Sequence, residues 1–223
     1  MRVIARVHSD FATKFGVPRQ SGLVESLEST LVFEPEFRNE EALRGLEGFS
    51  HLWLVWVFHH ADRPGWSPTV RPPRLGGNVR MGVFATRSPF RPNPIGLSAA
   101  RLAGLEHTRD RGTVLHLRGT DLVDGTPVLD IKPYVPYADA IPGALGGFAS
   151  APAGEVLAVD IPPALLDRVP PDRREALRGV LAQDPRPRCQ GDSDRVYGFA
   201  FAGLEVRFTV SGALLTVREI REA

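Results

Sequence analysis

The first 135 residues consist mainly of short runs of β-branched, aromatic and other apolar residues, separated by glycine, proline or acidic residues. Such runs are typical of β-strands. They predict strands over residues 3–8, 27–33, 49–60, 79–85, 111–122 and 126–135. Because helices do not alternate with these strands, the pattern favours a barrel or closed sheet over a doubly wound fold.

Two local signals refine this prediction. Residues 39–48 are expected to form a helix, since Asn39 can cap it, Glu40 and Glu41 suit its first turn, and Gly48 can end it. The Asp124-Gly125 pair lies between the last two predicted strands, and Asp-Gly is a strong signal for a tight turn. It predicts that these two strands form a hairpin.

The composition changes near residue 139. Residues 139–154 are rich in alanine, glycine and proline and read as a connector. Helices are predicted over 163–169 and 171–182, each starting with a proline, followed by a three-stranded meander. Its predicted strands are 195–201, 205–210 and 214–220. The chain is therefore predicted to be mainly β, with a single-sheet β-barrel over 1–140 and a small α+β domain over 155–223.

Composition narrows the class of protein. The chain has 223 residues, 43% of them hydrophobic, and contains no apolar run long enough to span a bilayer. Its start lacks the apolar core of a signal peptide. Its single cysteine, Cys189, cannot form an internal disulfide and is too few for a thiolate metal site. We expect a cytoplasmic protein.

The charge is unevenly distributed, although the formal net charge is only +1. Residues 21–62 carry eight acidic side chains against two arginines, and residues 63–118 carry ten arginines against two acidic side chains. A local excess of arginine favours an anionic or nucleic-acid substrate. Pairing of the acidic and basic segments on an ordinary surface explains the charge equally well.

Two proline-containing loops are the strongest candidate sites. Residues 81–98 run from an apolar strand into a loop with three prolines that hold Arg87 and Arg91, which predicts a preformed anion-binding loop. Residues 16–20, Gly-Val-Pro-Arg-Gln, offer a guanidinium and an amide to a polar ligand. Taken alone, residues 16–20 are more consistent with a plain turn than with a binding loop.

Other polar residues allow more than one reading. His59 and His60 follow an apolar run and should face opposite sides of the sheet, so a zinc site with His51 is disfavoured. An acidic cluster surrounds the predicted hairpin, where an aspartate can equally well bond its own backbone. The cluster consists of Asp121, Asp124 and Asp130, with Lys132 and Tyr134 beside it. Trp53 and Trp56 are expected in the core.

Several nucleotide and hydrolase motifs are absent from the sequence. Ser9, Ser88 and Ser98 do not lie in a Gly-x-Ser-x-Gly elbow, which leaves serine hydrolysis unsupported. The chain has no Walker phosphate loop and no Gly-x-Gly-x-x-Gly after a strand, so nucleotide-triphosphatase and Rossmann chemistry are not indicated.

Five ordered blocks within residues 1–150 closely resemble the TrmO (TsaA-like) family of tRNA methyltransferases. They are KFGVPRQ at 14–20, LEGFSHLW at 46–53, RPPRLGGN at 71–78, GVFATRSPFRPNPIGLS at 82–98 and DLVDGTPVLDIKPY at 121–134. In addition, QDPRP at 183–187 and RVY at 195–197 resemble the smaller C-terminal region of bacterial members.

The resemblance implies a β-barrel that binds S-adenosylmethionine, acts as a homodimer and methylates N6 of threonylcarbamoyladenosine beside the tRNA anticodon. The cofactor contacts that it implies are Pro18, Arg19, Gln20, His59, His60, Arg87, Leu97, Asp124, Gly125, Thr126 and Pro127. The chain departs from the family at His60, where other members can have glutamine. No metal is implied.

The substrate suggests further roles. A base that takes the N6 proton should assist transfer, and Asp124, Asp130 and Tyr134 are its candidates. Arg91 or Arg74 is expected to bind the threonyl carboxylate, and Phe90 to stack on a base of the anticodon loop, although packing explains Phe90 equally well. Arg186, Arg188 and Arg195 are expected to help hold the tRNA.

Two alternatives stay open. One is an RNA-binding barrel without enzymatic activity, and the other is a methyltransferase acting on a small molecule.

Overall fold

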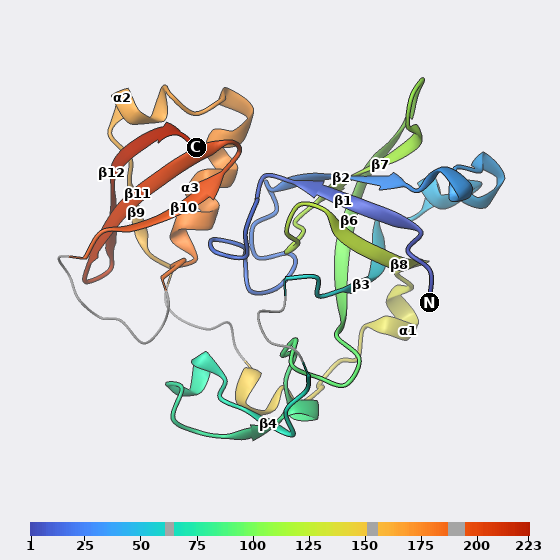
Figure 1. Ribbon diagram of the computed structural model, residues 1–223, viewed down its shortest axis with the longest axis horizontal. Coiled ribbons are helices and arrows are strands. Elements are labelled where there is room, and N and C mark those ends of the chain that lie inside the picture. The colour runs from blue at the N-terminus through green and yellow to red at the C-terminus, as the bar shows by residue number, and fades with distance from the viewer. Residues whose placement is uncertain (61–64, 151–155, 187–194) are drawn as a thin grey trace.

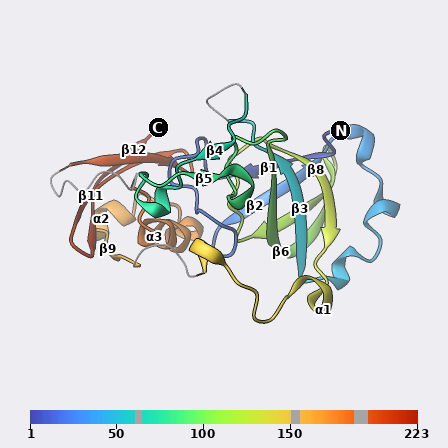
Figure 2. The same cartoon turned by 90° about the horizontal axis from the view of Figure 1, so that it is seen from below.

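The computed structural model describes residues 1–60, 65–150, 156–186 and 195–223. It contains a six-stranded barrel and a smaller C-terminal unit, which lie side by side (Figures 1 and 2). The prediction of a mainly β chain with a barrel and a smaller α+β region is confirmed. Among the described residues, no helix is long and apolar enough to cross a membrane.

The barrel closes in the strand order β1-β2-β7-β6-β3-β8, and every neighbouring pair is antiparallel. Its strands are β1 (Ala5–Ser9), β2 (Glu28–Phe33), β3 (His51–Val57), β6 (Ile95–Thr108), β7 (Gly112–Arg118) and β8 (Thr126–Pro133). Closure leaves no unpaired edge on the sheet.

The barrel interior is filled by matching large side chains on β3 with small residues on β6. Leu52 lies opposite Ala100, Leu54 opposite Ser98 and Trp56 opposite Gly96. The six residues are buried, and they alternate along the strands as residues on one face of a strand must. A six-stranded barrel has a narrow interior, so a large residue on one strand requires a small one on its neighbour.

Two strand predictions are corrected. The longest strand of the barrel, β6, was not predicted, because its alanine and glycine residues have low β-propensity. The predicted hairpin at Asp124-Gly125 is wrong, since β7 pairs with β2 and β6 whereas β8 pairs with β1 and β3. The chain instead passes across the end of the barrel, where Asp124 N bonds Phe11 O and Gly125 N bonds Val7 O.

The segment expected to form one helix over 39–48 forms two 3₁₀ turns, η2 (Glu40–Leu43) and η3 (Leu46–Gly48). The predicted cap is present, since the Asn39 side chain accepts a hydrogen bond from Glu41 N. Gly45, at φ 83°, interrupts the helical path between them. A third turn, η1 (Pro35–Phe37), precedes them.

A small lobe extends from the barrel between β3 and β6 (Figure 1). It contains the ribbon β4 (Thr69–Val70) and β5 (Met81–Gly82), with the turns η4 (Pro73–Leu75) and η5 (Val83–Ala85). The strand expected over 79–85 is thus limited to two residues. After β8, α1 (Pro136–Asp139) and η6 (Gly147–Ala149) follow along the connector.

The C-terminal unit is a four-stranded sheet in the order β10-β11-β12-β9, covered on one side by helices. The predicted meander is confirmed as β10 (Tyr197–Phe201), β11 (Leu204–Ser211) and β12 (Leu214–Glu222). The parallel strand β9 (Ala158–Asp160) was not predicted. Helical structure is present where it was predicted, as α2 (Pro163–Leu166), η7 (Pro171–Arg173) and α3 (Arg174–Ala182).

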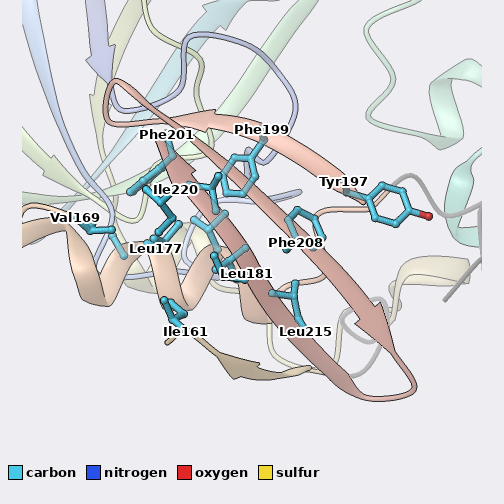
Figure 3. Packing of buried hydrophobic residues seen from close by; sticks show 14 of the residues in the cluster. Ile161, Val169, Leu177, Leu181, Tyr197, Phe199, Phe201, Phe208, Leu215 and Ile220 are labelled. Atoms are coloured by element: carbon cyan, nitrogen blue, oxygen red, sulfur yellow. The ribbon is translucent and has the colours of Figure 1, made fainter. Parts of the chain in front are cut away.

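The core of the C-terminal unit lies between α3 and this sheet. Leu177 and Leu181 of α3 pack with Phe199, Phe201 and Phe208 of the sheet (Figure 3). The N-terminal loop that precedes β2 joins the same cluster through Phe11, Val24 and Leu27. The loop before β2 therefore packs into the core of the C-terminal unit, while the barrel interior forms a separate core.

Candidate functional site

A cavity of about 650 Å³ opens at the end of the barrel where β3 ends and β8 begins. Four segments that are distant in sequence line it: the loop 14–20, the turn 56–60 after β3, the loop 87–97 into β6, and residues 121–126. Cavities of this size hold small-molecule ligands and cofactors. The sequence predicted the first and third segments as loops with a binding role.

The two proline-containing loops are joined across the cavity. The Arg87 guanidinium donates a hydrogen bond to the Gln20 side-chain oxygen. Arg91 donates to Thr86 O at 3.2 Å, which ties this arginine to its own loop. Arg19 and Lys14 line the same cavity, so its rim carries four cationic side chains. Such a rim attracts an anionic ligand.

The C-terminal unit supports the loop 14–20 from behind. Gly16 has φ +89°, and a Cβ placed on it would lie 2.4 Å from the Phe199 ring of β10. Only a glycine combines this backbone conformation with this approach. The C-terminal unit thereby contributes to the cavity wall through the loop that it holds in place.

His59 and His60 lie in a turn just beyond β3, and both line the cavity. The expectation that they face opposite sides of a sheet is wrong, because the strand ends at Val57 and the alternation ends with it. Their ring centroids are 4.1 Å apart. Burial, with a smaller contribution from His60, lowers the pKa of His59, so its imidazole is neutral at pH 7.

A chain of hydrogen bonds crosses the inner wall of the cavity. The Trp56 indole N–H donates to Ser98 Oγ at 3.0 Å, and Ser98 Oγ donates to Asp121 Oδ1 at 2.6 Å. A Cβ on Gly96 would lie 2.3 Å from the Trp56 ring, so the indole packs directly on the backbone of β6. Burial raises the pKa of Asp121, against the opposing effect of the Ser98 hydrogen bond.

Most of the predicted ligand-binding residues line this cavity. They are Pro18, Arg19, Gln20, His59, His60, Arg87, Phe90, Arg91, Leu97 and Thr126. Sequence reasoning assigned Trp56 to the core, placed Asp121 in an acidic cluster without a specific role and found no support for Ser98 as a nucleophile. In the structure, Trp56 and Asp121 line the cavity, and Ser98 bonds both of them. The alternation along β3 and β6 could have indicated that Trp56 and Ser98 share a face.

Asp124 and its neighbours form the outer side of the turn beside the cavity. The Asp124 carboxylate accepts from Ser9 N at 3.1 Å and lies 3.3 Å from His8 Nδ1, while its backbone carbonyl bonds His59. Gly125 O accepts from Arg6. Pro127 is already part of β8. The contact that links this turn to the cavity is made by the backbone carbonyl of Asp124, which bonds the ring of His59.

Three predicted residues lie elsewhere. Asp130 is half exposed and pairs with Lys132 at 3.0 Å. Tyr134 contacts Trp53 at the opposite end of the barrel. Because it lies eight residues beyond Thr126, it is roughly 26 Å away along the strand. Arg74 is on η4 in the small lobe and is not among the residues that line the cavity.

Two of the three C-terminal arginines are described. Arg186 bonds both oxygens of Asp184, at 2.7 and 2.9 Å, and this contact outweighs burial and lowers the pKa of Asp184. The charge of Arg19 also acts on Asp184, so this pair lies near the cavity rim. Arg195 lies over the Tyr197 ring at 5.5 Å. Arg188 and Cys189 are outside the described residues. Within the described ranges, no cluster of three or more His, Cys, Asp or Glu side chains is arranged to hold a metal ion.

Comparison with known proteins gives a consistent family. The model of the tRNA-methyltransferase O N-terminal domain matches residues 6–140, and that of the TrmO C-terminal domain matches residues 157–223. The tRNA (adenine(37)-N6)-methyltransferase of Escherichia coli K12 is 46% identical over 218 residues, covering 94% of this chain and 92% of the relative.

Two proteins of Pseudomonas aeruginosa are also similar. A putative S-adenosylmethionine-dependent methyltransferase is 45% identical over 214 residues, covering 92% of this chain and 90% of the relative. The crystal structure of TrmO from this organism superposes with a TM-score of 0.79 at 38% identity, covering 98% of this chain and 95% of that one. The chain belongs to the tRNA-methyltransferase O family.

Proposed function

We propose that the protein transfers a methyl group from S-adenosylmethionine to N6 of the adenine at position 37 of tRNA, beside the anticodon. The observation that carries this proposal is the convergence of both proline-containing loops and the His59-His60 turn on one cavity. The 46% identity to an enzyme of this name over 94% of the chain supports it.

The residues of the cavity fit the cofactor. S-adenosylmethionine has a carboxylate, an adenine and a positively charged sulfur, and it supplies a methyl group that the sulfur releases readily. Arg87 or Arg19 would bind the carboxylate in a bidentate fashion. Leu97 would pack on the adenine, and Thr126, the residue of the turn 124–126 that lines the cavity, would face the positive charge. Pro18, Gln20 and His60 would complete the enclosure.

For the tRNA substrate, we propose threonylcarbamoyladenosine. Its threonyl carboxylate would be bound by an arginine, and Arg91 suits this role better than Arg74 because it lines the cavity. The ring of Phe90, on the same loop, would stack on a neighbouring base of the anticodon loop. Arg186 and Arg195 would contact the phosphates of the tRNA.

The main contribution of the protein to the rate would be alignment. Holding the acceptor nitrogen, the methyl group and the sulfur in line converts a bimolecular reaction into an intramolecular one. With its ligands bound, the cavity would also exclude water, which strengthens the contacts of the cationic rim with these ligands. Of the three predicted bases, Asp124 is the one next to the cavity, but its carboxylate is engaged by His8 and Ser9.

Two measurements test this function. Calorimetry should show saturable binding of S-adenosylmethionine, and an RNA-binding protein without activity would show none. A methyl-transfer assay should label tRNA that carries threonylcarbamoyladenosine, but neither free metabolites nor tRNA lacking the threonylcarbamoyl group. Equal labelling of the unmodified tRNA would refute the substrate, and labelling of a metabolite alone would favour the small-molecule alternative.

We further propose that the protein acts as a homodimer in the cytoplasm, where tRNA is modified. Sedimentation equilibrium of the full chain measures the oligomeric state directly.

A further inference from the structure

We propose that the Asp121 carboxylate is the base that takes the proton from N6 of the substrate adenine. This inference rests on the function proposed above. It adds a catalytic residue that the family resemblance did not assign.

The position of Asp121 carries the argument. Asp121 is one of the residues that line the cavity, and Ser98 Oγ links its carboxylate to the Trp56 indole. Ser98 Oγ holds Oδ1 from β6 at 2.6 Å, and the Ser21 backbone N–H holds the carboxylate from the N-terminal loop. These bonds come from two separate elements, so the orientation of the carboxylate is set before any ligand binds.

The other acids considered lack this placement. The Asp124 carboxylate points to His8 and Ser9, and Asp130 pairs with Lys132. Tyr134 is at the other end of the barrel. His59 does line the cavity, but burial lowers its pKa, which makes it a weaker base than a free imidazole. Its neutral ring has a single N–H, which can donate to the backbone carbonyl of Asp124 or of Val57.

The environment makes Asp121 a stronger base than an aspartate in water. Burial raises its pKa, and the Ser98 hydrogen bond and the charge of Arg87 oppose this without cancelling it. A base is most effective when its pKa approaches the working pH. The other charged or titratable groups that line the cavity are Lys14, Arg19, His59, His60, Arg87 and Arg91.

The proposed step balances. The lone pair of N6 is delocalised into the adenine ring and the carbamoyl group, so N6 is a poor nucleophile while it keeps its hydrogen. The N6–H bond breaks and its proton passes to Asp121, while the bond from N6 to the methyl carbon forms. The bond from that carbon to sulfur breaks, and its electron pair remains on sulfur. The proton then leaves to water when the product departs.

The decisive variant is Asp121→Asn, since asparagine keeps an oxygen that can accept the Ser98 hydrogen bond but cannot take a proton. We expect kcat for modified tRNA to fall by about 10²–10⁴-fold. Binding of S-adenosylmethionine by calorimetry should stay within about threefold. Asp110→Asn is the matched control, because Asp110 is exposed at the turn between β6 and β7.

A second variant tests the role even if Asp121→Asn folds poorly. Ser98→Ala removes one hydrogen bond that lowers the pKa of Asp121, while the Ser21 backbone N–H still bonds the carboxylate, so the acidic limb of the kcat profile should move to higher pH. A merely structural Asp121 would change the rate without moving this limb.

The outcomes separate the two proposals. If the wild-type protein does not methylate tRNA, the proposed function fails. If it does, and Asp121→Asn keeps kcat within twofold or loses only cofactor affinity, the assignment of Asp121 is overturned. An acidic limb that Ser98→Ala leaves unmoved overturns it as well.

Discussion

The two ends of the barrel carry similar side chains but differ in what covers them. One end brings together Trp56, His59 and Asp121 around the cavity. The other brings together Trp53, His51 and Tyr134. The ring centroid of Tyr134 is 5.5 Å from that of Trp53 and 6.3 Å from that of His51. Each end thus offers an indole, an imidazole and an oxygen-bearing side chain, which is a carboxylate at Asp121 and a phenol at Tyr134. Strands β3 and β8 run between the two ends.

The difference lies in the loops. The cavity end is enclosed by the loop 14–20, which the C-terminal unit supports, and by the loop 87–97. Burial at this end raises the pKa of Asp121 and lowers that of His59. Similar residue types are therefore not sufficient for a site of this kind, which also needs the loops that form a cavity around them. Four experiments test this conclusion.

The largest effect is expected for Arg87→Ala. The variant removes the guanidinium that spans to Gln20 and would bind the cofactor carboxylate. A charged hydrogen bond of this kind is worth about 1.5–3 kcal/mol, so cofactor affinity should fall by roughly 10- to 100-fold in calorimetry. Arg80→Ala, an exposed arginine of the same lobe, should keep the wild-type affinity. Unchanged affinity in the Arg87 variant would show that the rim does not bind the cofactor.

Gly96→Ala should be next in size. The added methyl group would lie 2.3 Å from the Trp56 ring, so the indole must leave the cavity wall. We expect a loss of about 2 kcal/mol in the free energy of unfolding, as in other overpacked cores, and about tenfold weaker cofactor binding. Gly104→Ala on the same strand has no atom within 4 Å of the new methyl group and serves as the control. Equal effects of the two variants would contradict this account.

Arg173→Met probes the support from the C-terminal unit. Arg173 lies 3.0 Å from the carboxylate of Asp10 and 3.2 Å from Glu28, so it joins η7 to both ends of the loop before β2. Asp10 would remain buried without its partner, and we expect a loss of about 2 kcal/mol in chemical denaturation at pH 7. Arg178→Met, on the exposed side of α3, is the control.

Asp10 determines how the loss of stability in Arg173→Met changes with pH. Burial raises the pKa of Asp10, and Arg173 opposes this, so the variant raises it further. A raised pKa in the folded state means that the protonated carboxyl favours folding, and this stability is lost as the pH rises through the folded pKa. The deficit should therefore be smaller at pH 4 than at pH 7. A deficit that grows on acidification would show that another group dominates.

The smallest effect is expected for two residues outside the cavity. Asp130→Asn and Tyr134→Phe should each leave kcat/KM for modified tRNA within about twofold, because neither residue lines the cavity. A loss of tenfold or more in either variant would mean that the residue takes part in the reaction after all.

Much of the molecule could be predicted from local patterns. Alternation, turn residues and caps identified most strands, the C-terminal meander and the Asn39 cap, because these depend on neighbours in the sequence. The proline-containing loops were predicted as binding loops for the same reason. The long strand β6 was missed, since its small residues are chosen to fit the large ones of β3 and carry little propensity of their own.

The way in which these pieces meet depends on the tertiary structure. Closing the barrel placed β8 between β1 and β3, so β8 does not form the hairpin with β7 that Asp124-Gly125 predicted. The connection between β7 and β8 instead crosses the end of the barrel, which brings Asp121 to the cavity. It also separated Tyr134 from the acids that precede it in sequence. Local sequence patterns were sufficient for most of the strands, the proline-containing loops and the family of this protein. The pairing of distant strands, which depends on filling a narrow interior, decided which side chains share the cavity.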